Sequence, residues 1–330
     1  MTHSSLTKIS ILFSTLYLGM LSNVFAAQSV DKQLAISSDT QVQIKVQRGD
    51  INIESWDQSE VSVTGTLDEM SEGFIFEQKG NNLNIEDKMP RHYNGGDQDG
   101  SKLTIKVPRT VKLSADTVSA NLQITQTQGE IDFSTVSGNI LADSLGGTPS
   151  LHTVSGNITT KGFDGKTMLD TVSGDIKDTE SKGEIKYRLV SGELESQTLA
   201  EKVKIEQVSG EIIADLRLAK SISVRTVSGD IEVIVGKSFD KANLESVSGD
   251  ITTRFVELPD ASFDLNGGPG GKIKNGLSQD VPQKSKYVQS ESLTFETGTG
   301  SGDVTMNTIS GNLILKTLTQ GSAKVEVTLN

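Results

Sequence analysis

The sequence predicts an all-β protein: a single-stranded β-helix, or flattened β-solenoid, with about 18 residues per coil and capping strands at both ends. Three observations predict this fold. A Val-Ser-Gly motif recurs every 18 to 20 residues, glycine recurs at nine-residue steps within that period, and apolar residues alternate with the glycines. A fixed period of this size indicates a stack of similar coils in which each coil contacts mainly its neighbours.

The serine of the motif marks each coil. Its spacing is 18 residues five times, then 19, then 20. The spacing grows by only two residues along the array, which is compatible with coils that stack in register. The motif serines are Ser119, Ser137, Ser155, Ser173, Ser191, Ser209, Ser228 and Ser248.

A finer period of nine predicts two bends per coil. From Gly129 to Gly210, nine of the ten positions at nine-residue steps are glycine, and Glu201 is the exception. Because nine is odd and a strand alternates with period two, each half-coil must bend once to keep its apolar residues inside. We therefore expect the motif valines to stack in the core, with the glycines either leaving room for bulk or adopting positive φ. The valines that define this expectation are Val136, Val154 and Val172.

The two half-coils differ in the size of their inward residues. Four residues after alternate glycines, one column is bulky and the other is small. This difference predicts a flattened cross-section with two unlike broad faces. The bulky column is Phe133, Leu151, Leu169, Tyr187 and Ile205, and the small column is Ala142, Thr160, Asp178, Ser196 and Ala214.

The chain divides into four parts. Residues 1–26 combine Lys8 with a short apolar run and a small residue at Ala26, which predicts a cleaved signal peptide and no transmembrane anchor afterwards. Residues 27–116 are strand-like without the period and are expected to start and cap the solenoid. Residues 117–255 form the regular repeats, and residues 256–330 hold a Gly/Pro-rich loop and closing coils. The expected location is therefore the periplasm or the cell exterior.

Three motifs together resemble a bacterial exported β-solenoid family of unknown function that carries the label "putative adhesin". They are the opening strand pair from Gly49 to Val63, the repeated Val-Ser-Gly-Asp/Asn-Ile, and the ending between Lys272 and Lys316. The resemblance covers nearly all of the chain after residue 26. It implies a β-helix and an exported protein, and it brings no catalytic residues.

The best candidate for binding is the column that directly follows the motif glycine. It begins with asparagine and then continues through five acids in consecutive coils, which predicts an outward stripe of like charges that repel one another. A basic partner or Ca²⁺ would relieve that repulsion, and a solvated acidic face is the alternative. The acids of the stripe are Asp175, Glu193, Glu211, Asp230 and Asp250.

The remaining composition excludes several classes of function. The chain has no cysteine, so neither disulfides nor thiolate chemistry is available, and its formal charge of −12 argues against a nucleic-acid partner. The motif serines lack a repeated histidine that would serve as their base, since only His92 and His152 occur after residue 26. No catalytic, cofactor-binding or metal residues are therefore assigned.

Function is expected to be a non-enzymatic binding, adhesion-like or structural role in the cell envelope, with an unidentified envelope polymer or protein as partner. The alternative is a carbohydrate-active β-helix enzyme that acts on envelope or extracellular polysaccharide. Asp178 is the residue that bears on this alternative. It occupies an inward position near Tyr187 and Arg188, although an early end of the strand would instead place it in a turn.

Overall fold

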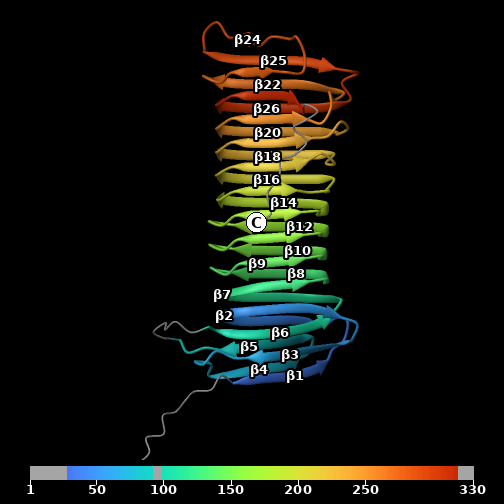
Figure 1. Cartoon of the computed structure of the whole chain (residues 1–330), viewed down its shortest axis with the longest axis vertical. Helices are drawn as coiled ribbons and strands as arrows, with labels where there is room; N and C mark the ends of the chain where they lie inside the picture. Colours follow the sequence, from blue (N-terminus) through green and yellow to red (C-terminus); the bar gives the residue numbers. More distant parts are fainter. Residues whose placement is uncertain (1–27, 92–98, 319–330) are drawn as a thin grey trace, which may run out of the picture.

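A computed structural model of the protein describes residues 28–91 and 99–318. These residues fold into a long rod of stacked strands that run across the rod axis (Figure 1). The 27 strands form one continuous, mostly parallel sheet, which confirms the predicted all-β solenoid. The strands are β1 (Ser29–Ala35), β2 (Gln41–Trp56), β3 (Glu60–Thr66), β4 (Gly73–Lys79), β5 (Asn82–Lys88), β6 (Ser101–Pro108), β7 (Thr110–Thr125), β8 (Gln128–Thr135), β9 (Ile140–Asp143), β10 (Gly146–Thr153), β11 (Ile158–Lys161), β12 (Asp164–Thr171), β13 (Ile176–Thr179), β14 (Lys182–Ser191), β15 (Leu194–Gln197), β16 (Lys202–Ser209), β17 (Ile212–Leu216), β18 (Ser221–Ser228), β19 (Ile231–Val235), β20 (Lys241–Ser248), β21 (Ile251–Phe255), β22 (Ala261–Pro269), β23 (Ile273–Asn275), β24 (Gln283–Lys284), β25 (Ser290–Thr297), β26 (Gly302–Ser310) and β27 (Leu313–Thr317).

Each regular coil contributes one long strand and one short strand. The long strands from β8 to β20 pair in parallel on one broad face, and the short strands from β9 to β21 pair in parallel on the other. The register advances by 18 residues between β8 and β14, by 19 between β16 and β18, and by 20 between β18 and β20. The serine spacing in the sequence therefore gives the register directly.

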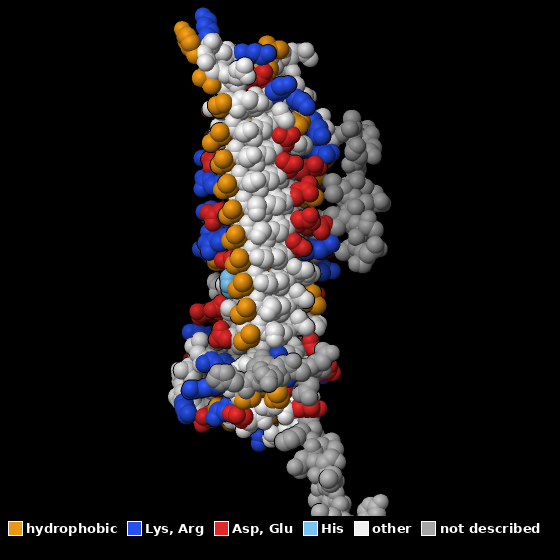
Figure 2. All heavy atoms as spheres, turned by 90° about the vertical axis from the view of Figure 1, so that its left-hand side faces the viewer, with side chains coloured by type: hydrophobic (Ala, Val, Ile, Leu, Met, Phe, Trp, Pro, Cys, Tyr) orange, Lys and Arg blue, Asp and Glu red, His pale blue; other side chains and the backbone are white. Residues whose placement is uncertain are grey.

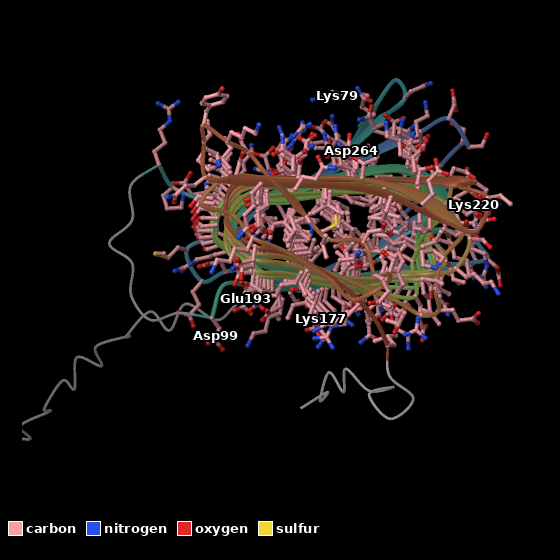
Figure 3. All side chains as sticks on the ribbon, turned by 90° about the horizontal axis from the view of Figure 1, so that it is seen from above. Lys79, Asp99, Lys177, Glu193, Lys220 and Asp264 are labelled. Atoms are coloured by element: carbon pink, nitrogen blue, oxygen red, sulfur yellow. The ribbon has the colours of Figure 1, made fainter. Side chains whose placement is uncertain are left out.

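The interior is packed by the bulky and small columns that the sequence predicts. Phe133, Leu151, Leu169, Tyr187 and Ile205 are fully buried on the long strands. The small column on the short strands is buried as well, so the two columns complement each other across the flattened core. Figure 3, which looks down the rod, shows this filled interior, with Lys177 on one broad face and Asp264 on the other.

The motif valines do not lie in the core, so that part of the prediction is wrong. They occupy matching positions in successive coils, and Val136, like most of the row, is about half exposed. The residue before each valine points inward instead, as Thr135, Thr153 and Thr171 show. The cause is the position of the bend: it falls within Val-Ser-Gly, so the strand's inward set ends one residue before the valine.

The glycines serve the close approach of successive coils. A Cβ added at Gly174, which lacks positive φ, would lie 2.6 Å from the carbonyl carbon of Gly156 in the coil below. At Gly165 the backbone adds a positive φ of 143° to the same kind of contact. Positive φ, one of the two proposed reasons, is therefore confirmed at six of the nine glycines at nine-residue steps between Gly129 and Gly210, and close contact between the backbones of successive coils adds a reason that the sequence interpretation missed.

The strands that cap the N-terminal end do not stack along the rod in the order of the sequence. β2 wraps around a whole coil and pairs in parallel with β7 above it and with β5 and β6 below it. Antiparallel strands β3 and β4 then pair with β6 and β5, and β1 pairs with β3. These antiparallel strands end the stack, as capping elements of a solenoid must.

The C-terminal end is capped by an inserted coil. β26 and β27, the last strands in the sequence, pair with β20 and β21 on one side and with β22 and β23 on the other. Antiparallel β25 then covers β22. Beneath this cap four aromatic rings contact one another in succession, with centroid separations of 6.1, 5.9 and 4.4 Å. The rings are those of Phe239, Phe255, Phe263 and Phe295.

The expected signal peptide, residues 1–26, lies outside the described residues, as does His92. Within residues 28–91 and 99–318, no helix is long and apolar enough to cross a membrane.

Candidate functional site: the Val-Ser-Gly edge

One narrow edge of the rod carries three parallel rows of side chains, because each coil turns there at its Val-Ser-Gly motif. Figure 2 shows the apolar row as a continuous orange line beside a pale strip, with acidic side chains on the far side of that strip. We call the apolar row the valine row, and the five acids the acid row. The valine row is Val118, Val136, Val154, Val172, Val190, Val208, Val227, Val247 and Ile309, and the acid row is Asp175, Glu193, Glu211, Asp230 and Asp250.

The acid row points outward, and Glu193 projects from the rod near one narrow end of its cross-section (Figure 3). The shorter Asp side chains of the acid row also link neighbouring coils. Asp175 Oδ1 accepts a hydrogen bond from the backbone N–H of Glu193 at 2.9 Å, and Asp230 Oδ1 accepts one from Asp250 at 2.8 Å. The same bond joins Asn139 to Asn157 at 2.9 Å. Asn and Asp side chains reach a neighbouring backbone donor readily, so this column has a structural role that the sequence interpretation missed.

The acid row carries no ion pairs among the described residues. None of its five carboxylates is paired, whereas several carboxylates on the broad faces are paired with Lys or Arg. Examples are Glu195 with Lys177 at 3.2 Å and Glu245 with Arg225 at 2.8 Å. Within the described ranges no group of three or more His, Asp or Glu residues converges as a metal site would require. The row is therefore a line of separate charges.

The bend takes two forms along the edge. At Gly138, Gly156 and Gly174 the glycine N–H donates to the inward threonine of its own coil, at 2.9 to 3.1 Å. At Gly210 and Gly229 it donates instead to a serine carbonyl of the next coil, at 3.2 and 3.0 Å. The second form leaves three buried inward oxygens without a partner in the described part of the chain. They belong to Gln207, Thr226 and Ser246.

The motif serines lie on the same edge, where serine hydroxyls contact the backbone. Ser137, Ser191 and Ser209 donate weakly to valine carbonyls of the coil below, at 3.3 to 3.4 Å. His152 lies on broad-face strand β10, where its Nδ1 is 3.7 Å from Asp170 Oδ1. These serine hydroxyls therefore bond the bend of one coil to the backbone of the coil below it.

Asp178 is inside the solenoid, so the alternative that placed it in a turn is wrong. It lies in β13 and is fully buried, where Thr160 and Ser181 donate to Oδ1 at 2.6 and 2.5 Å, and Tyr187 donates to Oδ2 at 2.7 Å. Burial raises the pKa of Asp178, and the three hydroxyl donors offset part of that effect. Arg188 lies outside on the broad face and pairs with Asp170 at 3.1 Å.

Tyr187 completes this internal cluster. Its hydroxyl also lies 2.8 Å from Ser196 Oγ, and burial raises its pKa well above the ordinary value for tyrosine. The cluster is hydrogen-bonded within the core; Thr160 borders one of the surface depressions described below, but Asp178 and Tyr187 line none of them. An acid that substrate cannot reach does not act as a general acid, so the cluster contributes to packing and specificity of the fold.

The broad face of long strands carries a separate cluster of charges around Glu206. Lys204 and Lys186 bind its two oxygens at 2.7 and 2.9 Å, and Arg188 lies 3.7 Å away. Hydrogen bonds from Lys204 and Lys186 lower the pKa of Glu206 to about 2. These four side chains form a network of surface ion pairs on the flat sheet.

We expect the Glu206→Gln substitution to lower the free energy of unfolding by about 1 kcal/mol at pH 7, a value discounted for solvent screening. Because the folded-state pKa is depressed, this contribution is present above the unfolded pKa near 4.5 and is lost as the pH falls toward about 2. Urea unfolding of both proteins between pH 6 and pH 3 measures it. A difference that stays constant over this range would contradict the assignment.

Among the depressions of the described surface, three contain carboxylates, which a glycosidase requires in a pair. One, of about 440 Å³, brings Asp143 and Glu180 together with Lys161 and Lys177. Glu180 is 62% exposed, so it lacks the burial by which glycosidases raise the pKa of their acid. The other two depressions, of about 420 and 610 Å³, each contain a single carboxylate, Asp50 and Glu245 respectively.

The family of the chain follows from a match to a family model. A model described as Toastrack DUF4097 matches residues 39–279, which is most of the chain. The chain belongs to the Toastrack DUF4097 family. This match agrees with the predicted β-solenoid, whereas the Val-Ser-Gly-Asp/Asn-Ile repeat as a mark of the family, the adhesin label and export stay predictions. A search of curated proteins found no significant match.

Two solved structures resemble this Toastrack protein weakly. One is a "Putative lipid binding protein" from Parabacteroides distasonis, with 14% identity and a TM-score of 0.41, covering 87% of this chain and 96% of that one. The other is a "putative cell adhesion protein" from Clostridium sporogenes, with 9% identity and a TM-score of 0.21, covering 88% of this chain and all of that one. Both TM-scores are below 0.5, so neither likeness carries an argument about function.

Proposed function

We propose that this Toastrack protein is an exported, non-enzymatic binding module of the cell envelope. The observation that carries the proposal is the Val-Ser-Gly edge, where apolar side chains are exposed in a line beside unpaired acids. A long, rigid, repetitive surface is suited to binding a partner along its length. Within the described residues, Asp178 is enclosed in the core, and Glu180, in the depression that also contains Asp143, is largely exposed.

The proposal is tested with the protein from residue 27 onward, immobilised and exposed to solubilised envelope material. We expect saturable, reversible retention of an envelope component, measured by elution and mass spectrometry. In parallel, incubation with envelope polysaccharides should release neither reducing ends nor unsaturated uronates. Catalytic turnover would overturn the non-enzymatic role, and failure to retain any component above a heat-unfolded control would overturn the binding role.

A further inference from the structure

The valine row is unusual because it is exposed and unbroken. Seven of its nine members are between 43% and 58% exposed, and the other two, Val154 and Val172, are half-buried. Single exposed apolar residues need no explanation, but a contiguous apolar strip on a described surface marks an interaction site. Nine residues at the spacing of hydrogen-bonded strands extend over roughly 38 Å along the rod.

The width of the row limits what can cover it. It is one side chain wide, so its area is on the order of 300 Å², whereas a stable dimer buries about 800 Å² on each partner. A second copy of the chain therefore gains too little from this strip. A linear molecule that follows the row is matched to it in length and width.

The charge beside the row indicates which linear molecule fits. The acid row lies parallel to the valine row on the same edge, and its carboxylates have no basic partner among the described residues. Stacked at strand spacing these charges repel one another, and cationic groups from a partner would lower that energy. A partner with apolar groups on one side and Lys or Arg on the other complements both rows at once.

The row ends in a groove, which provides an anchor. Near the C-terminal cap, Val227, Val247 and Ile309 line the depression of about 610 Å³ together with Pro269 and Val288. Here the valine row changes from an open ridge to a walled surface, so a bulky apolar side chain would lose the most contact with water at this point. Bulky side chains that fill such a depression contribute a large part of the binding energy in protein interfaces.

We propose that the Val-Ser-Gly edge binds a cationic amphipathic polypeptide segment of a partner protein. Its apolar side chains lie along the valine row, one bulky residue occupies the terminal groove, and its Lys and Arg residues face the acid row. This inference rests on the proposed binding function and names the chemistry of the partner. A negatively charged membrane surface does not fit, because the acid row would be repelled by it.

The test uses fluorescence anisotropy with a labelled 20-residue amphipathic Leu/Lys helix and a scrambled peptide of identical composition. We expect the amphipathic peptide to bind more tightly than the scrambled one. The triple variant V190S/V208S/V227S should weaken binding at least tenfold. The matched control L199S/L218S/L258S, which removes three exposed leucines outside the valine row, should stay within twofold of the unaltered protein.

A second pair of variants isolates the acid row. E193Q/E211Q/D230N should weaken binding about tenfold and flatten its salt dependence. The control E184Q/E195Q/E232Q removes the same number of charges from paired positions on the broad faces and should change binding much less. Circular dichroism confirms that each variant is folded.

If E193Q/E211Q/D230N and its control E184Q/E195Q/E232Q weaken peptide binding equally, only general charge attraction is present and the proposal is overturned. Binding to phospholipid vesicles that is lost in V190S/V208S/V227S would overturn it in favour of a membrane surface. If the envelope component retained by the unaltered protein is retained equally by this variant, the proposed function stands and the edge assignment fails. No retention by either protein would instead contradict the proposed function itself.

Discussion

The Asp178→Ala substitution is expected to lower the free energy of unfolding by about 3 kcal/mol or more. The change leaves a cavity and removes the acceptor of three buried hydroxyl groups, which belong to Thr160, Ser181 and Tyr187. The Asp178→Asn substitution should cost about 1 kcal/mol or less. Its amide oxygen can replace Oδ1, and its amide nitrogen can donate to the Tyr187 hydroxyl, which then donates to Ser196.

The pH dependence separates the two variants. Because burial raises the folded-state pKa of Asp178 above the ordinary 3.8, the folded protein holds the proton more tightly than the unfolded chain does. The carboxyl's contribution is therefore fullest below pH 3.8 and declines as the pH rises toward the raised value. Asn does not titrate, so the stability of Asp178→Asn relative to the natural protein should improve across that interval.

Urea unfolding followed by far-ultraviolet circular dichroism, at several pH values, measures both effects. The control is Asp164→Ala on the exposed start of β12, which should change stability by no more than about 0.5 kcal/mol. An Asp178→Asn protein as unstable as Asp178→Ala would contradict the hydrogen-bond assignment. An Asp178→Ala protein as stable as the control would show that the cluster does not hold the core.

The Gly174→Ala substitution is expected to cost about 3 kcal/mol or more, the upper end for overpacking. The added Cβ would meet the backbone of Gly156 with its carbonyl carbon at 2.6 Å and its oxygen closer still. Backbone atoms in a hydrogen-bonded ladder cannot rotate away as a side chain can, so the two coils must separate. Since Gly174 has no positive φ, the loss would report the contact between coils and not strain in φ.

The Gly146→Ala substitution is the matched control, because this glycine also lacks positive φ and meets chiefly the flexible Gln128 side chain, at 3.1 Å. We expect it to cost about 1 kcal/mol or less. Urea midpoints and hydrogen exchange at the flanking strands provide the measurement. If both alanines cost the same, the glycine column is not a column of close backbone contacts.

Spacing and alternation in the sequence predict some features of this fold and not others. Register and core columns follow from spacing and alternation, which is why Phe133 and Ala142 lie where the period places them. The exact residue at which a strand bends does not follow from the sequence. Alternation fixes only that every second residue points inward, so this inward set can end at the motif valine or at the residue before it. The prediction that the motif valines lie in the core is wrong for this reason. The sequence places Asp178 near Tyr187 but does not predict the full Asp178 cluster, because its donors come from β11, β14 and the connection between β13 and β14.

The site divides in the same way. The outward position of the acid row follows from alternation, but its backbone hydrogen bonds depend on the distance between coils, which the sequence does not contain. Whether an acid forms an ion pair depends on whether a Lys or Arg lies beside it in a neighbouring coil, and for the described acids this occurs on the broad faces and not on the acid row. An in-register alignment of the outward positions, with Lys177 beside Glu195, could have revealed that contrast.

The order of the last strands has a consequence for how the chain matures. Strands β26 and β27 follow β22, β23 and β25 in the sequence, yet they occupy the layer between β20/β21 and β22/β23. Stacking of coils in sequence order therefore stops at β21 and resumes only with β26. Until β26 is in place, the edge of β20 is open to another strand. A chain interrupted before β26 would therefore keep an exposed sheet edge at this end of the rod.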